Sequence, residues 1–136
     1  MFDDAGQHAP CVNAWLERAG RGLSSPALRR LLEAALGALW VRTQTTLGEV
    51  TLTAIGERVL YTAAEKYPFL ASFKIDPPRG IELRAVEGLP VPTEAELKEA
   101  CRFVLIELLS VLGNLTAQIL TAELHAELTA VATAPR

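Results

Sequence analysis

The segment from Glu94 to Leu120 carries apolar residues so regularly that it constrains the fold more than any other part of the chain. They recur at intervals of four, three, four, three, four and four residues, which is the spacing of a helix face that packs on another helix. These residues are Leu97, Cys101, Val104, Leu108, Val111, Leu115 and Ile119. We therefore predict one long helix over this segment, with these residues forming an apolar seam.

The apolar surface of this predicted helix is wider than the seam, because Phe103, Leu105 and Leu109 among others lie outside it. A helix that is apolar almost all round is buried on several sides, so it is either the central helix of a bundle or the core of a homodimer. What remains is a polar strip of Glu107, Ser110, Asn114 and Gln118. Three interpretations stay open for this strip: a solvent face, a polar pair that fixes the register of a symmetric interface, or the lining of a ligand pocket.

Composition favours the same fold class for the rest of the chain. The 136 residues include 22 Leu and 21 Ala, the two strongest apolar helix formers, and 50% of all residues are hydrophobic. This length suits one hydrophobic core. We predict a single, mainly α domain over residues 1–136, a compact bundle of four to five helices with one β-hairpin, and flexible ends at 1–9 and 132–136.

Start and stop signals place the first two helices. Pro10 suits the first position of a helix over 10–19. Ser25 is the predicted cap of a second helix over 26–41, with Pro26 in its first turn.

Two capping boxes follow, Thr46 with Glu49 and Thr93 with Glu96. The first favours a helix over 47–66 that Pro68 ends, although the β-branched residues of 41–55 leave a hairpin there as the alternative. The second begins the helix at Glu94, and Thr121 either caps a last helix to about residue 131 or lies inside one continuous helix.

The segment between the two boxes has a different pattern. Apolar and polar residues alternate from Phe73 to Ala85 around the turn-rich sequence 76–80, which is typical of a β-hairpin. Such a ribbon is marginal alone and must pack on a helix or on another chain. The stretch 87–92, with one Gly and two Pro, is predicted to be a linker.

Charge argues against several classes of partner. The net charge of −3 disfavours nucleic acid and anionic lipid. Charge is nonetheless uneven: five Arg oppose two Glu over 15–42, whereas six Glu oppose two basic residues over 94–128. Charged and polar residues interrupt 101–120, which argues against a membrane span. With no signal-like start, we expect a cytoplasmic protein, and ten Arg against three Lys suggest a bacterial source.

The residue types that carry chemistry are few. His8 lies in a polar N-terminal segment that we expect to be mobile, and His125 lies on a predicted helix where it cannot chelate a metal together with Glu127, two residues away. Cys11 and Cys101 are predicted to be reduced and buried, because neither belongs to a metal-ligand pair or a disulfide framework. We therefore expect no catalytic residues, no metal site and no cofactor.

The sequence leaves two functions open. The first is a non-catalytic interaction or regulatory module, such as an adaptor or a signalling component. We expect it to form a homo-oligomer, such as a homodimer, through the seam of helix 94–120, and a further protein partner is possible. The alternative is a domain that senses a small ligand in an apolar pocket between helices, near Trp15, Trp40 or Tyr61.

Overall fold

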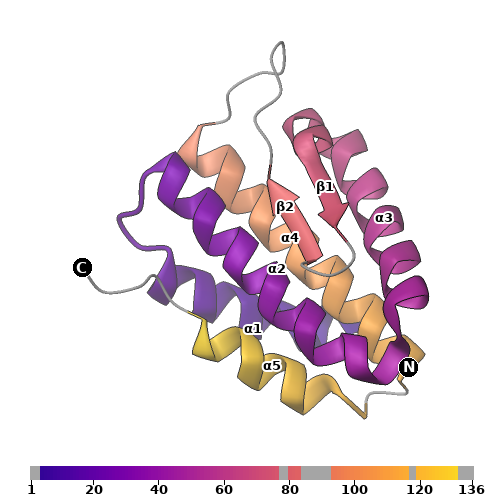
Figure 1. The fold of residues 1–136 in the computed structure, drawn as a ribbon. Helices are drawn as coiled ribbons and strands as arrows, with labels where there is room; N and C mark the ends of the chain where they lie inside the picture. The colour runs from indigo at the N-terminus through magenta and orange to yellow at the C-terminus, as the bar shows by residue number, and fades with distance from the viewer. Residues whose placement is uncertain (1–3, 77–79, 84–92, 117–118, 132–136) are drawn as a thin grey trace.

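Five α-helices build the part of the chain described by this computed structural model, which comprises residues 4–76, 80–83, 93–116 and 119–131. Figure 1 shows them packed around one another as a bundle, so the predicted helical bundle is confirmed. The helices are α1 (Asp4–Ala19), α2 (Ser25–Leu47), α3 (Glu49–Lys66), α4 (Glu94–Leu115) and α5 (Thr121–Ala130).

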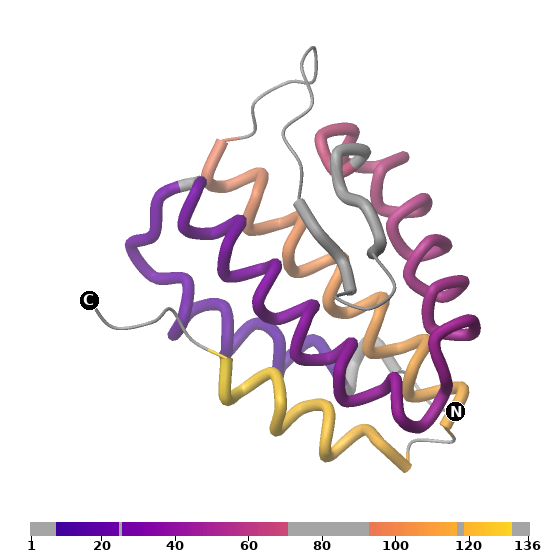
Figure 2. The backbone as a smooth tube through the Cα atoms, in the orientation of Figure 1, coloured from indigo at the N-terminus to yellow at the C-terminus, as the bar shows by residue number. Residues whose placement is uncertain are grey.

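Helix α4 is the centre of the bundle, as Figure 2 shows by following the backbone alone. It packs against α1, α2, α3 and α5. Most of its apolar residues are therefore covered by the chain's own helices. Of the two alternatives for a helix that is apolar almost all round, α4 is the central helix of a bundle. The buried residues of α4 are Leu97, Ala100, Cys101, Val104, Leu105, Leu108, Leu109, Leu112 and Gly113.

Between α3 and α4 the chain forms a short 3-10 helix, η1 (Pro68–Ser72), and then two four-residue strands. Strands β1 (Phe73–Asp76) and β2 (Gly80–Leu83) pair antiparallel, with Phe73 opposite Leu83. Strand β2 packs on α2 and strand β1 on α3. Figure 1 shows the ribbon lying between these two helices, which supplies the packing that an isolated two-stranded ribbon lacks.

Helix α1 begins at Asp4, six residues before the predicted start, so residues 4–9 are helical and Pro10 lies inside the helix. Proline inside a helix costs a backbone hydrogen bond. Tertiary packing outweighs that local penalty here, because His8 and Val12, on either side of Pro10, are fully buried.

Helix α2 begins one residue earlier than predicted and ends six residues later. Its N-cap is Ser24, not Ser25, and the Ser24 hydroxyl accepts a hydrogen bond from the backbone N–H of Ala27. The β-branched end of α2 is helical as far as Leu47. The buried Thr43 hydroxyl donates to the carbonyl of Leu39 at 2.8 Å, so the alternative hairpin over 41–55 is not formed.

One residue, Gly48, separates α2 from α3. Its φ of 86° lies in the left-handed region that favours glycine, and its N–H donates to the carbonyl of Gln44. The predicted capping box of Thr46 and Glu49 is wrong, because Thr46 still belongs to α2 and Gly48 itself is the N-cap of α3. Helix α3 ends at Lys66, two residues before Pro68 as expected.

The second capping box is confirmed. The Thr93 hydroxyl accepts from the N–H of Glu96 at 3.1 Å, and the Glu96 carboxylate accepts from the N–H of Thr93 at 2.9 Å. Helix α4 ends at Leu115, five residues short of the prediction, and the helices over 94–131 are two. Leu120, not Thr121, is the N-cap of α5. The predicted linker 87–92 and the tail 132–136 lie outside the described residues.

Candidate interaction surface

The seven seam residues of the sequence prediction do not form one surface. Leu97, Cys101, Val104 and Leu108 are buried in the bundle core, so in this fold they are not available to a second chain. Val111 is half-buried. Only the last two, Leu115 and Ile119, are largely exposed. The physical reason is that α1, α2 and α3 cover the first turns of α4, and the helix ends before its apolar pattern does.

Three large aliphatic side chains are exposed at the end of the bundle where α4 stops. Leu115 is 56% exposed, Ile119 is 78% exposed and Val50, in the first turn of α3, is 84% exposed. Figure 1 shows the end of α2, the start of α3, the end of α4 and the start of α5 at this same end of the bundle. We call Val50, Leu115 and Ile119 the apolar end. The sequence pattern does not indicate Val50, because its exposed position depends on the helix break at Gly48.

The predicted polar strip is divided in the same way. Glu107 and Ser110 are half-buried, Asn114 is exposed and Gln118 lies outside the described residues. The Ser110 hydroxyl oxygen is itself buried and has no hydrogen-bond partner among the described residues. The three described residues of the strip therefore run from the packed body of α4 onto its exposed last turn. These three residues form neither one pocket nor one solvent face.

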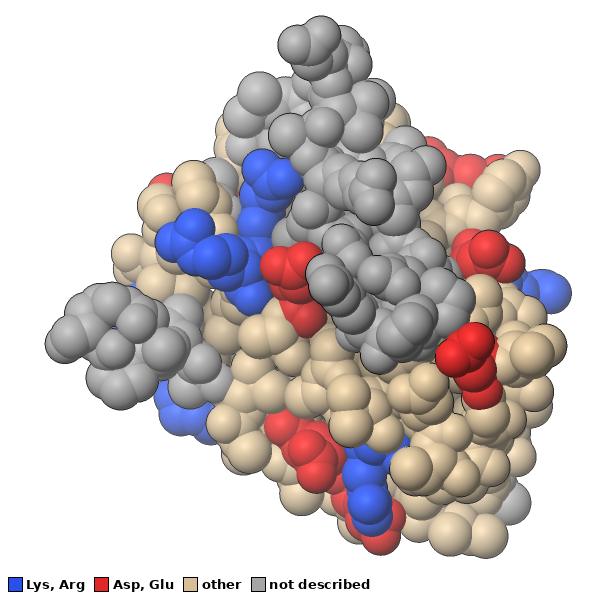
Figure 3. Space-filling model, in the orientation of Figure 1, with Lys and Arg blue, Asp and Glu red and all other residues tan. Residues whose placement is uncertain are grey.

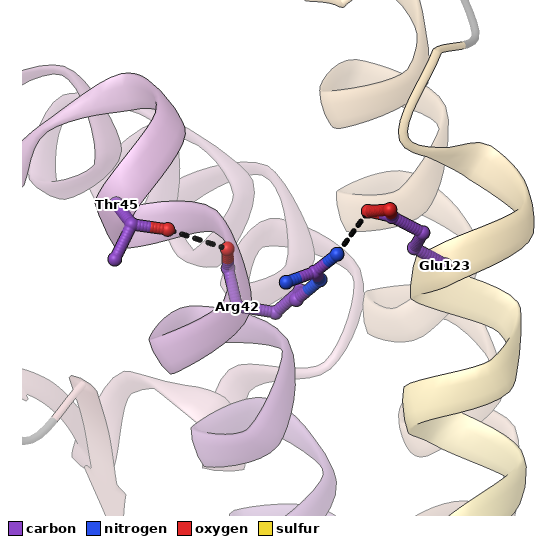
Figure 4. Close-up of polar contacts among 3 residues, drawn as sticks. All are labelled: Arg42, Thr45 and Glu123. Carbon is purple, nitrogen blue, oxygen red and sulfur yellow. Dashed lines mark hydrogen bonds and ion pairs between the residues drawn. The ribbon is translucent and has the colours of Figure 1, made fainter.

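A shallow groove of about 600 Å³ lies between α2 and α5. Figure 4 shows the ion pair that spans the two helices here, with the Arg42 guanidinium of α2 donating to the Glu123 carboxylate of α5. Both side chains are close to half exposed, so this pair positions α5 on α2 more than it stabilises the fold. The groove is lined by Gly37, Ala38, Val41, Arg42, Thr45 and Glu127.

The two histidines, 117 residues apart in sequence, are bonded to each other. His8 Nδ1 and His125 Nε2 are 2.8 Å apart, and the rings meet edge to face. His8 lies in α1 and is fully buried beside His125 of α5, so it does not lie in an exposed end of the chain. Burial lowers the pKa of His125, so the folded protein favours the neutral imidazole that this hydrogen bond needs.

Both cysteines are free thiols, but the prediction that both are buried holds for Cys101 alone, because Cys11 is half-buried. Burial raises the pKa of Cys101 to about 12, which keeps its sulfur protonated and unreactive near neutral pH. Burial also raises the pKa of Cys11, against the opposing effects of a hydrogen bond with Thr129 and the charge of Arg18. Among the residues that the structure describes, no group of three or more His, Cys, Asp or Glu is placed to hold a metal ion.

The aromatic residues that sequence analysis associated with a ligand pocket do not converge. Trp15 and Trp40 are buried in the core, and the Trp15 indole N–H donates to the backbone carbonyl of Val131 at 2.7 Å. Tyr61 lies on the outer face of α3 and is 71% exposed. The two tryptophans therefore serve packing, and Tyr61 is separate from them.

Within the described residues, none of the helices has the length and apolar character needed to cross a bilayer.

Comparison with known proteins found no matching family model, no matching curated protein and no matching solved structure.

Proposed function

We propose that this chain is a non-catalytic interaction module that self-associates through the apolar end. The observation that carries the proposal is the exposure of three large aliphatic side chains, Val50, Leu115 and Ile119, at one end of an otherwise well-packed bundle. Single exposed apolar residues are ordinary on protein surfaces, but several large ones at one end of the molecule favour a contact with another chain.

The apolar end is a smaller contact surface than the seam of helix 94–120 that the sequence predicts. Burying a large aliphatic side chain completely is worth about 1.5 to 3 kcal/mol, and these three are more than half exposed. Pairing two copies brings six such side chains together, enough to offset part of the cost of association. A module of this kind acts by binding, which suits an adaptor or signalling component.

The test is sedimentation velocity of the full chain over a series of concentrations. We expect reversible association, and we expect the double variant Leu115→Glu/Ile119→Glu to abolish it, because four buried carboxylates would face one another across the contact. Both side chains are exposed in the monomer, so the variant is expected to fold, with an unchanged helical circular dichroism spectrum.

Tyr61→Glu is the matched control, since it places a carboxylate at an equally exposed apolar position on the outer face of α3. It should leave association unchanged. If the wild-type chain remains monomeric at its solubility limit, or if the double variant associates as strongly as the wild type, self-association through the apolar end is wrong.

A further inference from the structure

Two aromatic rings form an open corner where α3 ends. Tyr67 is the C-cap of α3, and Phe103 lies in α4, which packs against α3. Their ring centroids are 6.0 Å apart, and the ring planes are inclined at 61°. A third ring, that of Phe69 in η1, is 6.2 Å from the ring of Tyr67. We call Tyr67 and Phe103 the aromatic corner, because two planes inclined in this way can turn their faces toward one point.

An ammonium group already lies at that point. Lys66 Nζ is 5.0 Å from the ring centroid of Phe103 and 5.7 Å from that of Tyr67. Both distances are within the range of about 6 Å over which the negative face of an aromatic ring attracts a cation. The Lys66 residue is exposed and both rings are half-buried, so the space in front of the two faces is open to solvent. A cation from outside can therefore compete with Lys66 for this space.

The charges around the aromatic corner also favour a cation. Glu107 lies four residues after Phe103 in α4, so the two side chains are neighbours on the helix surface. Among the described residues, the Glu107 carboxylate forms no ion pair. Helix α3 carries three Glu against one Arg and one Lys. Figure 3 shows more acidic than basic side chains on the side of the bundle where α3 lies. The field there attracts positive ligands.

The chemistry of the aromatic corner selects among cations. A primary ammonium is strongly hydrated and carries three N–H donors, which aromatic faces do not satisfy as water does. A trimethylammonium group has no N–H to satisfy, and its methyl groups can pack on both ring faces while its charge is attracted by them. We propose that the aromatic corner binds a trimethylammonium group, which displaces Lys66 from the two rings.

This inference goes beyond the proposed function, because the aromatic corner and the apolar end are separate surfaces. Sixteen residues of α3 lie between Val50 and Lys66, which is about 24 Å of helix. Two rings leave part of the bound cation in water, so the attraction is smaller than in a closed aromatic cage. We therefore expect a dissociation constant in the millimolar range.

The test is a titration of the full chain with tetramethylammonium chloride, followed by two-dimensional NMR of the backbone amides. Ammonium chloride at the same concentrations is the control for ionic strength and for a small hydrated cation. We expect saturable shifts at Lys66, Tyr67 and Phe103 with tetramethylammonium alone. Choline and free trimethyl-lysine are then compared as probes. Tighter binding of choline would indicate a free small molecule as the natural source of the group, and tighter binding of trimethyl-lysine a modified protein.

Substitutions distinguish binding at the rings from a purely structural role. Lys66→Ala removes the internal competitor and should lower the dissociation constant for tetramethylammonium about threefold. Phe103→Leu removes one ring face and should raise it about fivefold, whereas Phe103→Tyr keeps a ring and should stay within about twofold of the wild type. Arg58→Ala removes an exposed charge of α3 about 12 Å from Lys66, so it is the matched control for Lys66→Ala and should change little.

Three results would overturn the proposal. The first is the absence of saturable shifts with tetramethylammonium, and the second is a Lys66→Ala variant that binds no more tightly than Arg58→Ala. The third is a Phe103→Leu variant that binds as tightly as Phe103→Tyr. The Leu115→Glu/Ile119→Glu variant keeps the two surfaces apart, because it should lose self-association and retain the wild-type dissociation constant for tetramethylammonium.

Discussion

The two ends of α4 carry the same apolar spacing and have opposite environments. In the first four turns, the seam residues from Leu97 to Leu108 are covered by α1, α2 and α3. In the last turn, Leu115 is more than half exposed, and Ile119 beyond the helix is exposed further. A periodic apolar pattern thus specifies which residues share a face of the helix, but what covers that face depends on where the neighbouring helices end.

The largest difference in stability is expected when one leucine is truncated in the covered part of α4 and one in its exposed last turn. Leu108→Ala leaves a cavity in a close-packed core and should lower the free energy of unfolding by about 2 to 5 kcal/mol. Leu115→Ala removes contacts that are mostly with solvent and should lower it by about 0.5 kcal/mol or less. Urea denaturation monitored by circular dichroism measures both, and equal losses would contradict the comparison.

A change of pH tests how the burial of His125, which joins α5 to His8 of α1, affects the free energy of unfolding. The pKa of His125 is lowered in the fold by burial, so below the unfolded value of about 6.5 the unfolded chain binds a proton that the folded protein resists. The stabilisation is complete above that pH and is lost as the pH falls toward the folded pKa. The slope should stay under about 1.4 kcal/mol per pH unit, the value for one proton.

Urea denaturation at a series of pH values measures this slope, with His125→Asn as the comparison, because the variant has no imidazole at this position. The slope between pH 7 and 5 should be smaller in the variant than in the wild type. Identical slopes would show that His125 does not couple folding to protons.

The two ends of α4 are closed differently: Thr93 and Glu96 form a reciprocal capping box at the first end, whereas the Thr116 hydroxyl donates to the carbonyls of Leu112 and Gly113 at the last end. Thr93→Ala removes a hydroxyl that accepts the N–H of Glu96 and should cost about 1 kcal/mol of stability. Thr62→Ala, at an exposed position inside α3, is the control and should change stability by less than about 0.5 kcal/mol. A Thr93→Ala loss no larger than the control's would mean that the cap contributes nothing.

The smallest effect is expected at Gly37, in the middle of α2. Gly37→Ala adds a methyl group where nothing lies within 4 Å and removes a flexible residue from a helix interior. We expect the monomer to gain about 0.5 to 1 kcal/mol, measured by urea denaturation at low protein concentration. A loss of stability would show that the space outside Gly37 is occupied within the monomer.

The parts of the fold that sequence predicts are those decided by neighbouring residues. Thr93 and Glu96 close the start of α4 by bonds within four residues, so the pattern alone identifies them. Pro10 misplaces the start of α1, because the burial of His8 against a residue 117 positions away outweighs the local signal. The β-branched residues after Val41 favour a strand locally, yet α2 runs to Leu47 with Thr43 buried and its hydroxyl bonded within the helix.

The apolar end was predictable only in part, because local sequence patterns do not determine where a helix ends. The spacing of Leu115 and Ile119 places them on the seam, but their exposure depends on α4 ending at Leu115. The exposed position of Val50 depends in the same way on the helix break at Gly48. Each of these is a helix boundary, which single-sequence patterns locate least well.

The bonds between α1 and α5 have a consequence for biosynthesis. The indole of Trp15 donates to the carbonyl of Val131, and His8 bonds to His125, so the packing of α1 is completed by a helix that is synthesised more than 110 residues later. Contacts across more than 110 residues of chain cannot form during translation until the C-terminal helix has emerged. Until then the apolar side of α1 has only α2 to α4 to pack on, so the emergence of α5, and not that of α4, sets the moment at which the bundle closes.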